Sequence, residues 1–133
     1  MSHTRSNFRF GAYQSGTASL KGKSLTGVPR SNLTLGLDLS IPHGFYLSVT
    51  HQMVDSIPLT DLNDAYAAAY QLLNARVGWK GRIRKIELDY FISGDNLLNK
   101  PYSLGNDLNA FGRRYFNPAP LRNWVTGIVI RRS

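Results

Sequence analysis

The sequence predicts an all-β fold, an antiparallel up-and-down meander of about six strands formed by one segment, residues 1–133. Two observations carry this prediction: apolar residues alternate with polar ones, and the connections alternate between long and short. In residues 31–41, SNLTLGLDLSI, a leucine or isoleucine occupies every second position. Successive side chains of a strand point to opposite faces, so this run predicts a strand with one apolar face.

Further runs repeat this alternation at residues 7–14, 45–53, 70–80, 84–92 and 122–132. The first is the weakest, with Phe8, Phe10 and Ala12 on one side. Residues 61–70 leave a second interpretation open, because Thr60 or Asp61 could cap a short helix there.

The expected connections are two loops of about 15 residues (15–29 and 55–69) and a longer one at 93–121, and such lengths are uncommon in compact soluble domains. Tight turns are expected at 42–44 and around Gly81. Short turns at one end and long loops at the other are typical of transmembrane β-barrels of the outer-membrane type. The apolar faces would then meet lipid and the polar faces the lumen. A half-buried sheet of a soluble protein alternates in the same way, so the pattern leaves both open.

The composition is basic, with 16 Lys and Arg against 8 Asp and Glu, and a pI near 10.1. There is no cysteine, which excludes disulfides and thiolate metal sites. Arg113 and Arg114 precede Tyr115 in the last long loop, where basic and aromatic residues suit an anionic partner. We favour a membrane interface over single-stranded nucleic acid, because the aromatic residues lie beside strand ends.

The sequence predicts no enzyme and no catalytic, cofactor or metal site. No serine lies in a nucleophile elbow, and no phosphate-binding glycine loop precedes a helix. His51 is predicted to be a packed or lumen residue rather than a ligand. Glu87 and Asp89 share one face of a strand with Lys85 beside them, which favours a solvated face over acid–base chemistry.

The segments GDNLLNKPY (94–102) and GRRYFNPAPLRNW (112–124), followed by Gly127, resemble the C-terminal end of the TonB-dependent outer-membrane receptors. SLTGVPRSNLTLGL (24–37) is similar to the entry into an earlier strand of that family. The matching residues lie in the corner after the penultimate strand and in the re-entry into the last strand: Asn96, Leu97, Asn99, Lys100, Tyr102, Pro120, Arg122, Trp124 and Gly127. Leu97 and Tyr102 would anchor the loop base against the barrel wall.

The resemblance implies the C-terminal barrel portion of a receptor for energy-coupled uptake of a siderophore, cobamide or glycan in a Gram-negative outer membrane. Its partners would be outer-membrane lipid and the remaining barrel strands, with the energy-coupling protein reached only through an absent N-terminal part. The chain departs from the family in having no plug domain and six of about 22 strands. Arg132 stands where the family typically has an aromatic residue. The segment alone is therefore not expected to transport.

The N-terminus has no apolar signal region, which suggests either the tail of a longer exported precursor or a stand-alone remnant. If the chain folds alone, we expect self-association through edges at 7–14 and 122–132, or closure into a small barrel with its apolar side inward. Two alternatives to a receptor remain. One is a small soluble β-barrel binding module, and the other is a basic nucleic-acid-binding β-domain.

Overall fold

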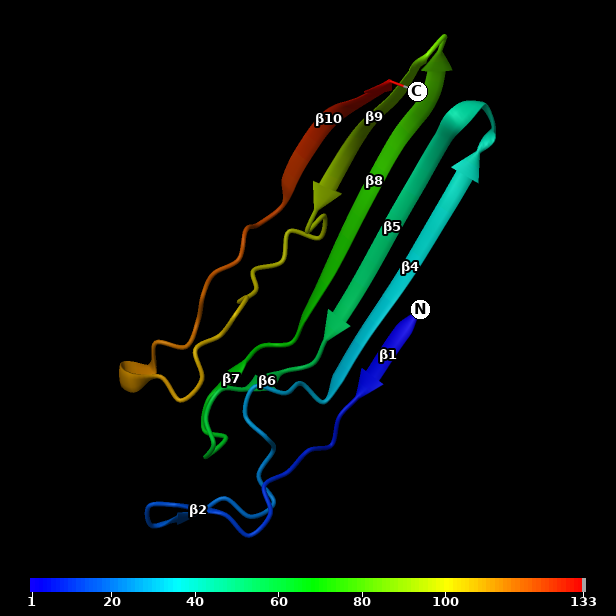
Figure 1. The fold of residues 1–133 in the computed structure, drawn as a ribbon. Helices are drawn as coiled ribbons and strands as arrows, with labels where there is room; N and C mark the ends of the chain where they lie inside the picture. Colours follow the sequence, from blue (N-terminus) through cyan, green and yellow to red (C-terminus); the bar gives the residue numbers. More distant parts are fainter. Residues whose placement is uncertain (133) are drawn as a thin grey trace.

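The computed structural model describes residues 1–132, which form an all-β fold built on one six-stranded antiparallel sheet (Figure 1). The predicted meander is confirmed, since the strands lie in the order β1-β4-β5-β8-β9-β10. Their bounds are Ser2–Arg5 (β1), Ser31–Ile41 (β4), Phe45–Val54 (β5), Tyr70–Ile83 (β8), Ile86–Asp95 (β9) and Asn123–Arg132 (β10).

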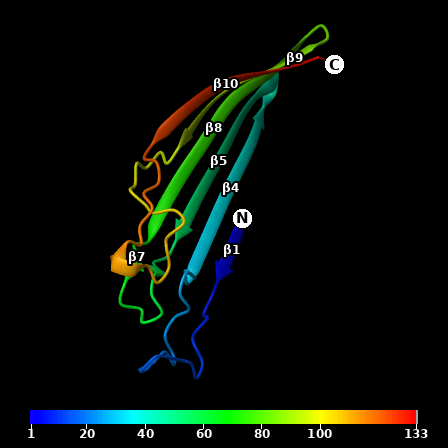
Figure 2. The same cartoon turned by 60° about the vertical axis from the view of Figure 1, so that its left-hand side comes forward.

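The two ends of the sheet are unlike, as the sequence predicts. At one end the 3-10 turn η1 (Pro42–Gly44) joins β4 to β5, and residues 84–85 join β8 to β9. At the other end lie three long loops, residues 6–30, 55–69 and 96–122, which gather below the sheet (Figure 2). The loops contain short elements of their own: β2 (Gln14–Ser15), β3 (Ala18–Ser19), β6 (Ile57–Pro58), β7 (Tyr66–Ala67) and η2 (Phe111–Arg113).

The predicted strand at residues 7–14 is wrong, and the sheet edge is formed by β1 instead. The backbone of this run is bonded within its own loop: the Phe10 N–H donates to Lys23 O (2.9 Å), and the Leu25 N–H donates to Phe8 O (3.0 Å). The alternation of Phe8 and Phe10 therefore describes one arm of a long hairpin-like loop.

The alternative of a helix at residues 61–70 is also wrong. Thr60 does not cap a helix; its hydroxyl donates to Asp64 Oδ1 at 2.5 Å and so closes a turn. Asn63 within that turn has a left-handed φ of 55°. The chain then enters β7, which pairs with β6.

The predicted turn around Gly81 is displaced by three residues, because β8 runs on to Ile83. Arg84 carries the turn with a φ of 56°, and its carbonyl accepts a hydrogen bond from Arg82 Nε at 3.1 Å. Gly81 instead lies under the ring of Trp79, which approaches a Cβ built there too closely for any side chain.

The register aligns the apolar residues of neighbouring strands. Leu47 lies opposite Leu39 on one side and Val77 on the other, and Val77 lies opposite Ile92. A one-residue slip would turn every apolar side chain of a strand to the other face, so this register follows from the alternation.

The buried core lies among the loops and at the loop end of the sheet. Leu20 and Leu59 are completely buried, and Leu59 packs with Ala67 and Tyr115. The middle of the sheet has no such buried core, since Leu37 there is 52% exposed and forms part of an uncovered face. The sheet is thus held by its backbone ladders and cross-strand contacts, while the loops have a small core.

Candidate functional surfaces

One face of the sheet is a continuous apolar surface, here called the apolar face. Its large side chains are exposed, for example Val77 at 50% and Ile128 at 63%. On β4 it runs from Leu33 to Ile41, about 26 Å along the strand at about 3.3 Å per residue, or about 20 Å high at a tilt of about 40°. Its apolar members are Leu33, Leu35, Leu37, Leu39, Ile41, Phe45, Leu47, Val49, Met53, Leu73, Ala75, Val77, Trp79, Ile83, Ile86, Leu88, Tyr90, Ile92, Trp124, Ile128 and Ile130.

Aromatic side chains lie near both ends of the apolar face. Near the short turns, Phe45, Trp79 and Tyr90 form one row across three strands. Trp79 Nε1 donates to His43 O at 2.9 Å, which fixes the indole in this row. At the loop end stands Trp124, 64% exposed. The apolar face therefore carries a row of three aromatic side chains toward the short turns and one tryptophan at the loop end.

His51 lies opposite Leu35 and Leu73, so the register places it on the apolar face, near the loop end. The sequence predicted a packed or lumen position, and the register places His51 on the apolar face rather than the polar face. Its side chain is half-buried among apolar neighbours.

The opposite face carries polar and charged side chains in a connected group. The Tyr46 hydroxyl donates to Asp89 Oδ1 at 2.8 Å and accepts a hydrogen bond from Arg76 Nε at 3.3 Å. The Arg76 guanidinium lies 3.6 Å from the centre of the Phe91 ring, within cation–π range. Lys80 Nζ lies 4.9 Å from the centre of the Tyr46 ring. The two faces of the sheet therefore differ sharply in polarity.

Two glycines make room for the rings of the polar face. A Cβ on Gly127 would lie 2.7 Å from the Phe91 ring, and one on Gly78 would lie closer still to the Tyr46 ring. Both pairs are directly cross-strand neighbours. The glycine at 127, which belongs to the sequence resemblance, therefore has a local reason: Phe91 occupies the space of its side chain.

Asn96 is the centre of the corner that follows β9. It is 3% exposed and has a left-handed φ of 48°. Its Nδ2 donates to Lys100 O (2.8 Å) and Pro120 O (3.3 Å), and its Oδ1 accepts from the Lys100 N–H (3.0 Å). Its own N–H donates to Asn74 Oδ1 on β8 at 2.9 Å. One side chain thus ties the corner to the re-entry segment.

The other residues of the resemblance lie around this centre. The Leu97 N–H donates to Leu73 O at 2.8 Å, and Leu97 and Trp124 both come within 2.6 Å of a Cβ built on Gly94. The Tyr102 ring lies 5.0 Å from that of Tyr70 at the start of β8. The Arg122 N–H donates to Asn99 Oδ1 at 3.2 Å. The structure therefore brings the two matched segments together at the loop base.

Of the three residues predicted to contact an anionic partner, Tyr115 is buried at 7% exposure in the loop core. Arg113 is at the surface, with one of its terminal nitrogens 3.9 Å from an Asp64 carboxylate oxygen. Arg114 is exposed. The interpretation of Tyr115 as a surface contact is therefore wrong, because its ring fills the space beside Leu59.

Two asparagines that the sequence analysis did not single out join the three loops. Asn63 Oδ1 accepts from the Ser24 N–H (2.7 Å), and its Nδ2 donates to Ser24 O (3.0 Å). Asn109 Oδ1 accepts from the Asp61 N–H (3.0 Å), and its N–H donates to Leu59 O (2.8 Å). Both residues adopt a left-handed φ, 55° and 51°, which asparagine tolerates better than most residues. Asparagines in long loops are therefore the sequence feature that could have identified these two positions.

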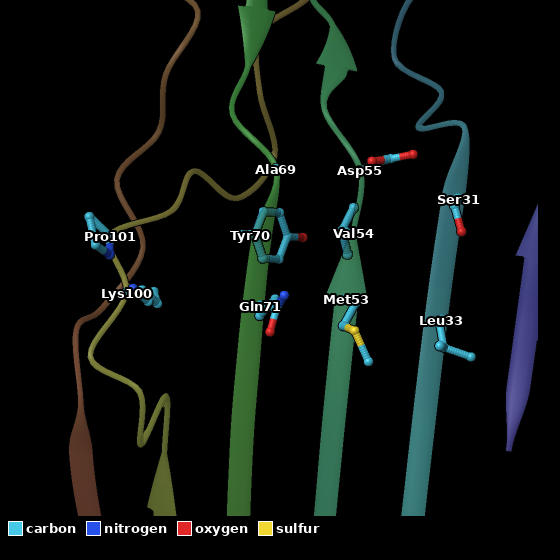
Figure 3. A pocket seen from close by; sticks show the side chains of 10 residues that line it. All are labelled: Ser31, Leu33, Met53, Val54, Asp55, Ala69, Tyr70, Gln71, Lys100 and Pro101. Carbon is cyan, nitrogen blue, oxygen red and sulfur yellow. The ribbon is translucent and has the colours of Figure 1, made fainter.

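A cavity of about 630 Å³ lies where β4, β5 and β8 meet the last long loop (Figure 3). Lys100 and Pro101 from that loop lie beside Tyr70 of β8, while Asp55 lies at the far side near Ser31. The rest of its lining is Leu33, Met53, Val54, Ala69 and Gln71. Its single cation and single carboxylate come from different loops, and no acid–base or ligand set converges here.

The outer strands leave backbone edges unpaired within residues 1–132. β10 pairs with β9 on one side only, along its whole length. β1 covers β4 only from Ser31 to Thr34, which leaves the outer edge of Leu35–Ile41 open. The sheet is not closed, so the predicted alternative of a small closed barrel is not the structure found. Open edges of this length pair readily with other strands.

A search against protein-family models finds none that matches the chain. In residues 1–132 there is no group of acidic, histidine or cysteine side chains that could hold a metal ion. The same residues include no helix of the length and apolarity needed to cross a membrane. The function is therefore argued from the two faces, the edges and the loops.

Proposed function

We propose that this chain is the C-terminal wall segment of a transmembrane β-barrel, of the kind found in TonB-dependent outer-membrane receptors. The observation that carries the proposal is the apolar face, which extends across five strands, is exposed, and is backed by a charged face. The parent receptor would take up a scarce ligand such as a siderophore, cobamide or glycan. This segment supplies wall and loops, and transport requires the rest of the receptor.

The exposed area supports a lipid environment on energetic grounds. Moving one large apolar side chain out of water gains about 1.5–3 kcal/mol. The apolar face has more than a dozen such side chains, so leaving it in water forgoes on the order of 10 kcal/mol or more. Lipid removes this cost without a second protein layer, and the aromatic side chains near both ends of the face suit its two interfaces.

The direction of the edge strands is compatible with barrel closure. β1 runs toward the long loops and β10 runs away from them, as the arrows in Figure 1 show. Any even number of additional strands can therefore join the two edges with antiparallel pairing throughout and all long loops on one side. Since unpaired backbone groups are costly in hydrocarbon, the remaining barrel strands are required partners. Without them, self-association through the edges is expected.

The receptor part of the proposal is supported by the loop base. The corner and the re-entry segment of the sequence resemblance meet in space, where Asn96 is bonded to both Lys100 and Pro120. The three long loops contact one another through Asn63 and Asn109, as expected of loops that cover one mouth of a barrel. The polar face, including Arg76 and Asp89, would line the lumen.

Paired cysteine variants test this proposal, because the chain has no native cysteine. Ile128 and Val129 are adjacent on β10, similar in size, and on opposite faces. The full chain carrying Ile128→Cys or Val129→Cys is reconstituted into phosphatidylcholine vesicles and treated with a water-soluble maleimide. We expect slow labelling at 128 and fast labelling at 129, with equal rates after detergent and denaturant are added.

Leu39→Cys and Ser40→Cys on β4 provide a matched second pair at the other side of the sheet. Equal labelling within both pairs in vesicles would contradict a membrane wall. A chain that stays monodisperse without detergent, with the apolar-face positions protected, would instead favour the soluble binding module.

A further inference from the structure

A group of cations surrounds the short-turn end of β8, β9 and β10. Arg84 and Lys85 form the turn between β8 and β9, and β10 ends with Arg131 and Arg132. The register places Arg132 opposite Ile86 and Arg131 opposite Glu87, so the end of β10 lies beside this turn (Figure 1).

These cations line a cavity of about 570 Å³ together with two isoleucines of the apolar face. Ile86 is 44% exposed and Ile130 is 68% exposed. The full lining is Arg84, Lys85, Ile86, Ile130, Arg131 and Arg132, which includes four cations and no carboxylate. The nearest acidic side chain along β9, Glu87, lies on the polar face, where its cross-strand neighbours are Arg82 and Arg131.

We propose that this cavity binds the phosphate headgroup of an anionic phospholipid at the short-turn border of the barrel. The inference rests on the proposed function, because it places the apolar face in a bilayer. Ile86 and Ile130 would contact the acyl chains, while Arg132 and the turn cations Arg84 and Lys85 meet the phosphate. Arginine is suited to this role because its guanidinium binds phosphate through two parallel hydrogen bonds.

The position of Arg132 supports a lipid rather than a lumen ligand. The alternation along β10 places its side chain on the same face as Ile130, at the end of the strand. A long cationic side chain there can lay its methylenes along apolar surface and hold its charge at the interface. Each basic residue near an anionic membrane surface gives about a fivefold preference for the charged lipid.

The two tryptophans of the chain make a local measurement feasible. Trp79 lies against Gly81, whose cross-strand row continues through Leu88 to Ile130 beside the cavity. Trp124 lies at the loop end of the apolar face. The full chain carrying Trp124→Phe is reconstituted in phosphatidylcholine vesicles that contain a small, equal fraction of brominated phosphatidylglycerol or brominated phosphatidylcholine. Quenching of Trp79 fluorescence then reports which lipid collects there.

We expect stronger quenching of Trp79 by the brominated phosphatidylglycerol. Lys85→Gln/Arg132→Gln should lower the preference by up to about 25-fold, since two cations are removed. The matched control, Arg113→Gln/Arg114→Gln, removes the same charge at the loops and should leave it unchanged. In a Trp79→Phe background, Trp124 should show no comparable preference.

Equal quenching by the two lipids in the parent chain would overturn the lipid site while leaving the membrane wall intact. No quenching of Trp79 by either lipid would instead contradict the proposed function itself. Loss of the preference on adding inorganic phosphate, but not chloride at the same ionic strength, would reassign the cavity to a free anion and also overturn the proposal.

Discussion

The sheet and the loops of this molecule are stabilised in opposite ways. The loops, although irregular, contain the completely buried Leu20 and Leu59 and a dense set of side-chain hydrogen bonds. The sheet, although regular, leaves side chains such as Leu37 and Ile128 more than half exposed. In a compact soluble domain the regular elements enclose the core and the loops lie on the surface. The proposed membrane wall predicts this reversal, since its sheet would meet lipid while its loops meet water.

This difference in burial also means that the sheet and the loops are stabilised by different interactions. Sheet register depends on backbone ladders and on what covers the apolar face, so it responds to lipid or detergent. The loop assembly depends on contacts internal to this chain. Changes that act on one region and not the other can therefore test the comparison.

The largest effect is expected from Leu59→Ala in the loop core. It removes a side chain packed against Ala67 and Tyr115, and truncation of a buried leucine typically costs about 2–5 kcal/mol. Leu37→Ala on the apolar face is the control, since its side chain is already 52% exposed. Urea unfolding of both variants in detergent micelles measures the difference. Equal losses would mean that the two regions are not differently stabilised.

A somewhat smaller loss is expected from Asn96→Ala. The change leaves the backbone groups of Lys100 and Pro120 without their partner, at about 1–3 kcal/mol, and puts alanine at a φ of 48°. Asn96→Gly removes the same hydrogen bonds but accepts the backbone angle. Comparing the two by unfolding separates the hydrogen bonds from the backbone strain. If Asn96→Gly is as stable as the parent chain, the hydrogen bonds contribute nothing measurable.

Within the sheet, Gly78→Ala should destabilise by about 1–3 kcal/mol, because the new methyl would overlap the Tyr46 ring and disturb its bond to Asp89. A double variant with Tyr46→Ala restores the space, so the two changes should be strongly non-additive. Denaturant unfolding of the double-mutant cycle measures this coupling. Additive losses would show that the ring does not depend on the glycine.

The sequence predicted the sheet well because its signal is local. Alternation along residues 31–41 fixes which side chains share a face, and hairpin pairing then aligns them with the next strand. It failed at residues 7–14, where the alternation of Phe8 and Phe10 is equally compatible with pairing inside a loop. At residues 61–70 the predicted loop is correct, and the alternative of a helix is excluded by the turn at Thr60–Asp64.

The functional surfaces at the loop base and at the short turns were predictable only in part. The resemblance singled out Asn96, but its role as a hydrogen-bond centre depends on Pro120, which is 24 residues further along the chain. The burial of Tyr115 depends on Leu59 in a different loop. Such contacts are set by tertiary packing, which no local pattern in the sequence encodes. The sequence places Arg131 and Arg132 at the short-turn end, but their position beside the Arg84–Lys85 turn follows only from the register of β10.

The smallest effect concerns the loop assembly at acidic pH. The hydrogen bond from Thr60 holds the pKa of Asp64 below its ordinary value of 3.8, with smaller contributions from Arg113 and Lys23. A carboxyl group with a lowered pKa stabilises the fold above pH 3.8 and loses that contribution as the pH falls through the folded-state value. Carbon NMR titration should therefore show a midpoint below 3.8 that rises in Thr60→Val and rises less in Arg113→Gln. A larger rise in Arg113→Gln would mean that the ion pair, rather than the hydroxyl, controls this carboxylate. Because the group is at the surface of the loops, its titration should leave the sheet register unchanged, which separates the two regions once more.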